Sequence, residues 1–364
     1  MAVLFGEIRR TPLLWLLVFV PLILVAQMLA PAAHTLLFLM SVAAIVPLAA
    51  LLSRATESVA SKTGDMIGGL LNATLGNLTE LLIALAALRA GQYVLVKASI
   101  VGAIVTNTLF MLGVSLLLGG LKYHVQEYNR NYARLQGGLL FLATIAMLIP
   151  SVLAETKSGA SSAEFTQSLS LGLSGLLVVI YALGLIFSLR THRELFASEG
   201  HAESTEKEWP LSLALGTLAG VTVLVALISE IFVESVQQAA TTLGITPAFV
   251  GIIVVALVGG AAEMVSAFSA ARKNNVDLSV GIALGSAVQI ALFVAPVLVL
   301  CSYFIGPAPM DLQFWRGAVA MMLIACVTAS LVTNAGRSAW FVGVLMITIY
   351  ISFGMTLYLL PPQP

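Results

Sequence analysis

Two glutamates lie in similar glycine-containing surroundings in the two halves of the chain. The first ends the sequence Gly-Asn-Leu-Thr-Glu, which runs from Gly76 to Glu80, and the second ends Gly-Gly-Ala-Ala-Glu, which runs from Gly259 to Glu263. The residues on either side are mainly leucine, isoleucine, valine and alanine. A carboxylate inside an apolar membrane segment is costly, and by default it indicates a functional site. Two such carboxylates in matching halves predict one shared site.

The composition is that of a protein that crosses a membrane many times. Hydrophobic residues make up 59% of the 364 residues and charged residues only 9%, whereas soluble domains are about 45–50% apolar and about 25% charged. The apolar runs are long and continuous, without the polar alternation of barrel strands, so we expect an all-α polytopic membrane protein. A spanning helix needs about 20 mostly apolar residues. The chain contains about eleven such stretches, near residues 13–30, 36–60, 66–88, 94–118, 135–153, 167–189, 210–240, 247–270, 278–304, 314–333 and 340–360.

Lysines and arginines are distributed unevenly between the two predicted sides of the membrane. Short cytoplasmic loops are enriched in these residues, and a cytoplasmic N-terminus places thirteen of the 17 on that side. We therefore predict a cytoplasmic N-terminus and a C-terminus on the opposite side. The thirteen are Arg9, Arg10, Arg54, Lys62, Lys122, Arg130, Arg134, Arg190, Arg193, Lys207, Arg272, Lys273 and Arg337, and the other four are Arg89, Lys97, Lys157 and Arg316.

The first apolar stretch has two interpretations. It is a cleaved signal peptide if Ala30-Pro31-Ala32 is a cleavage site, but the proline and the length of the apolar run argue for a spanning helix. Setting it aside leaves ten spans, and two groups of five must have opposite orientations in the membrane. We expect an extra helix at 1–33, a first five-helix repeat at 34–190, an acidic cytoplasmic linker at 191–209 and a second five-helix repeat at 210–364.

Matching glycines support the two repeats. Gly68 precedes Gly76 by eight residues, and Gly251 precedes Gly259 by the same distance. The following spans also align, with Gly102 opposite Gly285 and Phe110 opposite Phe293. Inverted repeats of this kind are typical of secondary transporters that alternate access around a central site.

Glycines beside the two glutamates predict helix breaks. Glycine is about 1 kcal/mol less favourable than alanine in a helix interior, and Gly76, Gly259 and Gly260 stand in the middle of apolar stretches. Elsewhere such glycines commonly allow helices to pack closely. Next to an intramembrane glutamate, a break would also place carbonyl oxygens at membrane depth, where only a lined cavity tolerates them.

Carboxylate and carbonyl oxygens suit a hard cation such as Ca²⁺, which takes about six to eight oxygen ligands. Two carboxylates balance one divalent cation, and they can instead accept protons, so that competition would couple the two ions. The alternative is that both glutamates only link helices through hydrogen bonds. We predict Glu80 and Glu263 as the metal ligands, with further cation-binding candidates Asn77, Thr79, Thr106, Asn107, Ser286 and Gln289.

Other acidic residues could guide ions toward this site. Glu57, Glu230 and Glu234 lie in corresponding spans of the two halves, and Glu57-Ser58-Val59 resembles Glu234-Ser235-Val236. We predict opposite-facing vestibules there, the alternative being simple solvation at helix ends. The linker could attract cations, or it could be a solvated connector. Its acids are Glu194, Glu199, Glu203, Glu206 and Glu208.

Two motifs carry a resemblance to a known family. Residues 259–294 resemble the second signature repeat of the cation/proton exchanger (CAX) family of calcium transporters, and residues 70–88 resemble its first-repeat partner. The similarity covers nearly the whole chain. It implies a Ca²⁺/H⁺ antiporter of the calcium/cation exchanger superfamily, with an additional first helix, two inverted five-helix repeats and Glu80 and Glu263 as the central acidic pair.

The sequence departs from the family's usual pattern near the site. The second motif commonly reads Gly-Asn-Ala-Ala-Glu-His, whereas Gly260 and Met264 replace the asparagine and the histidine. Ala103 and Thr106 stand where serines are common. These changes remove an amide and an imidazole, and they bear on affinity, ion preference and pH response.

We therefore expect a transporter and not an enzyme, with Ca²⁺ and H⁺ as transported ions, no cofactor, the lipid bilayer as its surroundings and no nucleic-acid partner. Short loops and the lack of a long regulatory tail favour a bacterial or archaeal cytoplasmic membrane. The second hypothesis is a related exchanger that is coupled to Na⁺ or moves another divalent cation such as Mn²⁺. The third is a channel or an intramembrane enzyme, although neither a His-Glu-x-x-His nor a Gly-x-Ser-x-Gly motif occurs.

Overall fold

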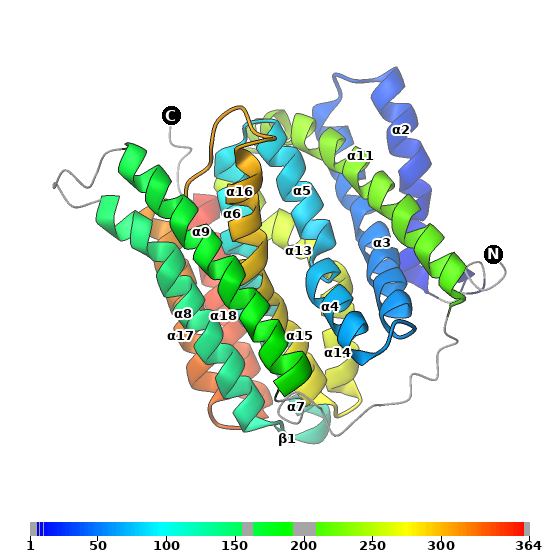
Figure 1. The fold of residues 1–364 in the computed structure, drawn as a ribbon. Coiled ribbons are helices and arrows are strands. Elements are labelled where there is room, and N and C mark those ends of the chain that lie inside the picture. Colours follow the sequence, from blue (N-terminus) through cyan, green and yellow to red (C-terminus); the bar gives the residue numbers. More distant parts are fainter. Residues whose placement is uncertain (1–5, 7, 10, 155–162, 192–208, 360–364) are drawn as a thin grey trace.

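The computed structural model describes residues 6, 8–9, 11–154, 163–191 and 209–359, and nearly all of them are helical (Figure 1). The five linker acids between Glu194 and Glu208 lie outside the described residues. The first half of the chain contains η1 (Pro12–Val18), α2 (Phe19–Leu29), α3 (His34–Ala60), α4 (Asp65–Leu75), α5 (Leu78–Arg89), α6 (Tyr93–Val105), η2 (Thr106–Met111), α7 (Leu112–Tyr123), β1 (Val125–Glu127), α8 (Arg130–Ala154), α9 (Ala163–Ile186) and η4 (Phe187–Thr191).

The second half repeats the sequence of long and broken helices. It contains α11 (Leu211–Leu243), α12 (Pro247–Phe249), η5 (Val250–Val255), α13 (Ala256–Gly259), α14 (Ala261–Arg272), α15 (Val276–Gln289), η6 (Ile290–Val294), α16 (Ala295–Ser302), α17 (Arg316–Thr333), β2 (Arg337–Ala339) and α18 (Trp340–Leu359). The segment η1 is a 3₁₀-helix, whereas η2, η4, η5 and η6 are π-helical.

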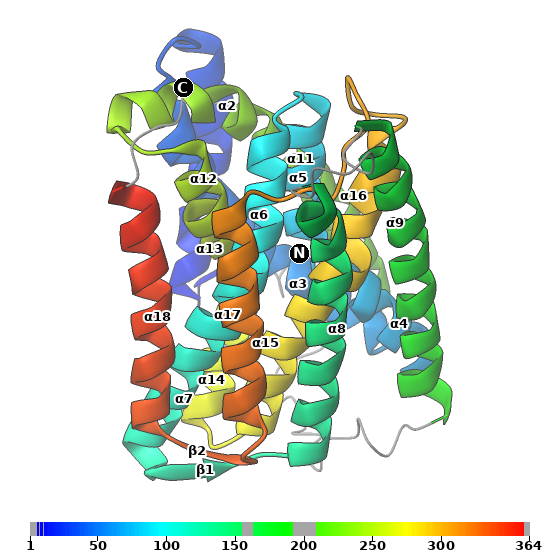
Figure 2. The same ribbon diagram turned by 90° about the vertical axis from the view of Figure 1, so that its left-hand side faces the viewer.

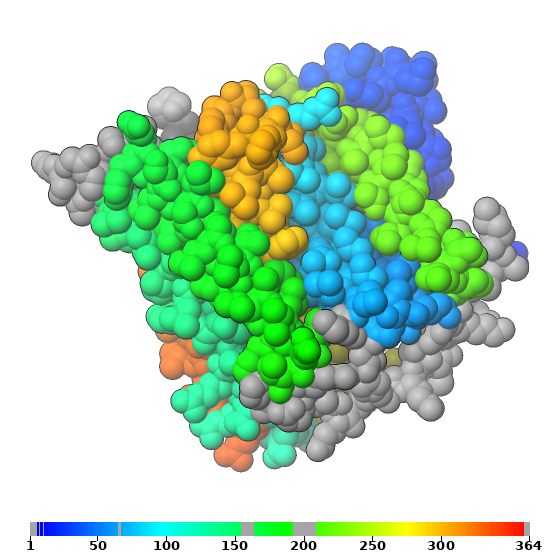
Figure 3. Space-filling model, in the orientation of Figure 1, coloured from blue at the N-terminus to red at the C-terminus, as the bar shows by residue number. Residues whose placement is uncertain are grey.

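The helices confirm the multi-pass membrane fold that the composition predicted. Within the described part of the chain, nine helices are long and apolar enough to cross a membrane. Two bent pairs pass the same test, which gives up to eleven spans. Their outer faces carry large apolar side chains, as on α9, where Leu176, Val179 and Leu183 are exposed. Figure 3 shows α9, in green, on the outside of the molecule, and such apolar faces suit contact with lipid.

A short antiparallel ribbon of β1 and β2 identifies one end of the bundle, which we call the ribbon side (Figure 2). The α14–α15 turn lies at the same end, because Lys122 Nζ and Tyr123 Oη both donate to the carbonyl of Arg272, at 3.0 and 3.1 Å. Asp277, at the start of α15, accepts a hydrogen bond from the backbone N–H of Asn129. These contacts fix the loops of both halves against each other at this end.

The two longest helices form a layer at one edge of the molecule. α3 and α11 pack along each other, and α2 covers α3 beside them (Figure 1). Phe38 of α3 and Phe232 of α11 meet in this contact with ring centroids 5.4 Å apart. The remaining helices surround α6 and α15, which are the most deeply buried spans among the described residues.

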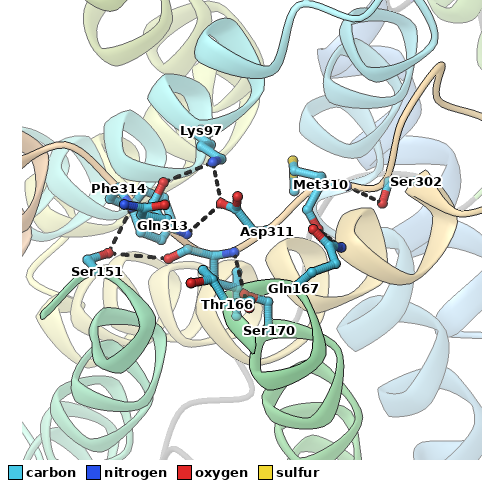
Figure 4. Close-up of polar contacts among 11 residues, drawn as sticks. Lys97, Ser151, Thr166, Gln167, Ser170, Ser302, Met310, Asp311, Gln313 and Phe314 are labelled. Atoms are coloured by element: carbon cyan, nitrogen blue, oxygen red, sulfur yellow. Dashed lines mark hydrogen bonds and ion pairs between the residues drawn. The ribbon is translucent and has the colours of Figure 1, made fainter. Parts of the chain in front are cut away.

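The connection between α16 and α17, residues 303–315, is fastened to three helices at the end opposite the ribbon (Figure 4). Lys97 of α6 donates to Asp311 Oδ1 at 2.5 Å and to the carbonyl of Gln313 at 2.9 Å. Ser151 of α8 accepts from the backbone N–H of Phe314 at 2.8 Å, and Ser170 of α9 accepts from that of Leu312 at 3.0 Å. The connection therefore joins α6, α8 and α9 at this end.

Asp311→Asn should lower the thermal unfolding temperature of the detergent-solubilised protein. The side chains of Lys97 and Asp311 are only 17% and 29% exposed, so the loss of this charged hydrogen bond should cost about 1–3 kcal/mol. We expect a decrease of about 2–5 °C in a fluorescence-monitored melt. Glu164→Gln, which removes an exposed carboxylate at the start of α9, is the control, and equal melting of both variants would contradict the role of the ion pair.

Candidate cation-binding site

Each half of the chain contains one helix that is broken near the middle of the bundle. The pair α4 and α5 bends by 42° between Leu75 and Leu78, and the pair that ends with α13 and α14 bends by 60° at Gly260. The structure places Gly76 and Asn77 in the first bend, whereas Gly259 is the last residue of α13. α5 runs away from the ribbon side and α14 runs toward it (Figure 1). This opposite direction is consistent with inverted repeats.

Glu80 and Glu263 occupy equivalent positions in the first turns of α5 and α14. The N-terminus of a helix carries a partial positive charge, so both carboxylates lie where the backbone favours negative charge. Glu80 packs against the other repeat, because its Oε1 is 3.3 Å from the position that a Cβ on Gly259 would occupy. Gly259 precedes Glu263 by only four residues, so Glu80 lies beside the bend that carries the second carboxylate. A larger residue at 259 would displace Glu80.

A chain of neutral polar groups connects the two repeats beside these carboxylates. Asn107 Nδ2 donates to Ser286 Oγ at 2.8 Å, Ser286 Oγ lies 2.7 Å from Asn77 Oδ1, and Asn77 Nδ2 donates to Gln289 Oε1 at 2.6 Å. The Ser286 hydroxyl therefore accepts one hydrogen bond and donates another, and it links Asn107 to Asn77. Since a serine hydroxyl has one proton, its donation to Asn77 leaves none for another acceptor.

The arrangement leaves a buried carboxylate oxygen for a ligand. Glu263 Oε2 is buried and has no hydrogen-bond partner among the described residues. An unsatisfied buried acceptor of this kind calls for a specific explanation, such as an ion, a proton or a water molecule. The surrounding groups supply hydroxyl and amide oxygens, and the oxygen ligands of hard cations are of this kind.

A cavity of about 800 Å³ reaches this point from the ribbon side. Glu263, Ser286 and Gln289 line it within the bundle, whereas the exposed residues Glu57 and Asn129 line it near the ribbon side. Glu80 does not line the cavity and is only 9% exposed. The structure therefore opens the site toward one side of the membrane, through Glu263.

Other predicted residues lie outside this polar chain. Thr79 is buried next to Glu80, and Thr106 donates to Tyr350 Oη at 3.2 Å instead of to the chain. Glu230 forms an exposed ion pair with Arg89 at 2.8 Å. The remaining vestibule candidate of α11, Glu234, accepts from Gln27 Nε2 at 3.5 Å. Neither glutamate of α11 lines the large cavity, which contains only Glu57 of the three.

The two unusual residues of the second motif, Gly260 and Met264, lie next to each other. A Cβ on Gly260 would lie 3.4 Å from Met264 Cε and 3.7 Å from Asn107 Oδ1. The space where an asparagine side chain would begin is thus bordered by the methionine methyl group and the Asn107 amide. Asn107 lies in the π-helical segment η2, and π-helical turns frequently occur at functional sites.

Several cavity residues had no signal in the sequence. Tyr181 of α9 donates to the carbonyl of Ala73 at 2.5 Å and stacks on Phe293, with ring centroids 5.2 Å apart. Gln136 of α8 donates to Tyr132 Oη at 3.0 Å. These side chains occur in apolar spans without a recognisable motif, and only the packing of α8 and α9 brings them to the cavity wall.

Curated proteins and a solved structure resemble this chain over nearly its full length. A Ca²⁺/H⁺ antiporter of Aphanothece halophytica is 38% identical and covers 98% of each chain. The Ca²⁺/H⁺ antiporter ChaA of Bacillus subtilis (strain 168) is 40% identical over 89% of this chain and 92% of its own length. The structure of native YfkE has a TM-score of 0.83 at 36% identity, covering 96% of this chain and all of that one.

A family model gives the same result for the two halves separately. The sodium/calcium exchanger protein model matches residues 33–190 and 213–359. These segments together make up well over half of the chain and include both glutamate motifs. The resemblance that the two motifs indicated is confirmed, and the chain belongs to the sodium/calcium exchanger protein family.

Proposed function

We propose that this protein is a secondary active antiporter that exports cytoplasmic Ca²⁺ in exchange for H⁺, by alternating access around Glu80 and Glu263. Two relatives that match at least 89% of the chain are named Ca²⁺/H⁺ antiporters. The observation that carries the site assignment is the buried Glu263 Oε2, which has no partner among the described residues and adjoins a cavity.

The neutral oxygens of the polar chain complete the proposed site. Ca²⁺ would bind between the two carboxylates, with Ser286 and Gln289 on the cavity wall and Asn77 and Asn107 bonded to them. The carboxylates would neutralise the charge of the ion. When Ca²⁺ leaves, protons would replace it, because an uncompensated pair of negative charges is costly at membrane depth. Because Ca²⁺ and protons exclude each other from the carboxylates, the transport of one ion would be coupled to the transport of the other.

The distribution of basic residues between the two ends of the molecule supports one orientation of the protein in the membrane. Lys122, Arg272 and Arg337 lie at the ribbon side, whereas Arg89 and Lys97 lie toward the other end. The excess of basic residues at the ribbon side supports a cytoplasmic position for that side. The cavity would then admit Ca²⁺ from the cytoplasm. We place the protein in the cytoplasmic membrane, with 34–190 and 210–364 as the two inverted repeats.

The test is radioactive Ca²⁺ uptake into proteoliposomes under an imposed pH gradient. The wild type should accumulate Ca²⁺, and Glu80→Gln and Glu263→Gln should fall to the level of protein-free liposomes while remaining folded, because each removes one of the two charges that bind the ion. Glu164→Gln, at an exposed position on α9, should transport normally.

Ion replacement in the same assay separates the candidate activities. Uptake that ignores the pH gradient and follows a Na⁺ gradient would assign the protein to sodium-coupled exchange. If Mn²⁺ reduces the uptake of radioactive Ca²⁺ more strongly than excess unlabelled Ca²⁺ does, the main substrate would be a different cation. Wild-type uptake by either glutamine variant would contradict the two-carboxylate site.

Ser286→Ala should raise the Ca²⁺ concentration for half-maximal uptake. It removes the hydroxyl that bonds to Asn107 and Asn77 and lines the same cavity as Glu263, and we expect a rise of about tenfold, which corresponds to about 1.4 kcal/mol. Ser235→Ala is the control, because this buried hydroxyl donates only to carbonyls of its own helix, Ile231 and Phe232. An unchanged half-maximal concentration in Ser286→Ala would exclude the hydroxyl from the site.

A further inference from the structure

A tight crossing of two helices closes the molecule between the site and the end opposite the ribbon. A Cβ on Gly102 of α6 would lie 2.5 Å from the Cα of Ile252 in η5, and a Cβ on Gly251 would lie 2.3 Å from the Cβ of Ala98. No side chain larger than glycine fits at either position without moving a backbone. Small residues permit this close approach of membrane helices.

The repeat relationship defines the equivalent crossing on the other side of the site. In the register that places Gly68 opposite Gly251 and Gly102 opposite Gly285, α4 corresponds to η5 and α15 corresponds to α6. At this second crossing the helices are apart. Gly69 of α4 and both Gly281 and Gly285 of α15 line the 800 Å³ cavity. One crossing is thus closed, and its counterpart is open.

All four contact positions of the open crossing are glycines. The closed crossing uses Ala98, Gly102, Gly251 and Ile252, and the equivalent positions are Gly281, Gly285, Gly68 and Gly69.

The present conformation does not require the two glycines of α15. The nearest atom to a Cβ on Gly285 is 3.9 Å away, and on Gly281 it is 3.6 Å away, so alanine would fit at both. Glycine destabilises a helix interior relative to alanine. The helix contacts of this conformation therefore do not explain why these two positions are glycines.

We propose that Gly281 and Gly285 close onto Gly68 and Gly69 in the second state of the transport cycle, while the contact between Gly102 and Gly251 opens. The closed crossing shows the geometry, and the cavity supplies the space into which α4 and α15 move. This backbone contact would seal the ribbon side and leave Glu80 accessible from the opposite side. The inference rests on the transport function proposed above.

Disulfide trapping tests the contact independently of the transported ion. In Gly69→Cys/Gly285→Cys, the two residues occupy positions equivalent to Ile252 and Gly102, whose backbones touch in the closed crossing. A disulfide needs Cα atoms about 4.4–6.8 Å apart. Mild oxidation in proteoliposomes should link the pair, shown by mass spectrometry of the joined peptides, and reduction should restore transport.

The control pair is Gly138→Cys/Gly285→Cys, because Gly138 lies on an exposed face of α8 with no atom within 4 Å of its Cβ position. This pair should not link. The single variants identify any link to the native Cys301 or Cys326. If both thiols of the first pair react with a small maleimide but form no disulfide, the proposed contact does not occur.

Gly285→Leu provides a second readout. The cavity has room for the side chain, so the protein should fold and bind Ca²⁺, but the crossing could not close and the rate of uptake should fall at least tenfold. Gly138→Leu should transport like the wild type. Wild-type uptake by Gly285→Leu would overturn the proposal. A wild-type protein without proton-driven Ca²⁺ uptake would instead contradict the proposed function, and the disulfide result would still decide the contact.

Discussion

The burial of two carboxylates near the centre of an apolar bundle is the constraint on which the rest of the structure depends. An isolated charge at the centre of a membrane helix costs roughly 2.5–3.5 kcal/mol by insertion measurements. Glu80 and Glu263 both lie in first turns of half-helices, where backbone N–H groups favour negative charge. Those half-helices exist only because each span is broken just before its glutamate. Each helix break therefore creates the helix N-terminus that favours the negative charge of the glutamate after it.

The two repeats share the same broken-helix backbone, but the polar side chains at the site differ between them. Asn77 and Ser286 belong to the polar chain and bond to each other across the repeats. Their sequence counterparts in the opposite repeats are Gly260 and Ala103, which offer neither an amide nor a hydroxyl. One side of the carboxylate pair is consequently rich in neutral oxygens and the other is poor. The asymmetry of the site is encoded in the sequence and does not depend on which side the cavity opens.

Packing around the site combines rigid and separable contacts. The β1–β2 ribbon and the connection held by Lys97 and Asp311 join elements of both repeats at the two ends of the molecule. Between these ends, α6 and α15 pass through the centre and cross the broken helices at two equivalent places. Only one of the crossings is in contact. A transporter needs this combination, because alternating access requires two seals that are not formed together.

The sequence by itself determined the spans, the glutamate pair and the bends near Gly76 and Gly260. Length, hydropathy and glycine content are local properties, and in a lipid bilayer they decide where a helix spans and where it breaks. The tertiary structure alone decided that Asn107 joins Ser286 while Thr106, one residue away, turns to Tyr350. It also decided that Glu230 pairs with Arg89 outside the cavity. These partners are more than 140 residues apart in the chain, and which of them meet depends on the rotation and crossing of packed helices, which no local pattern specifies.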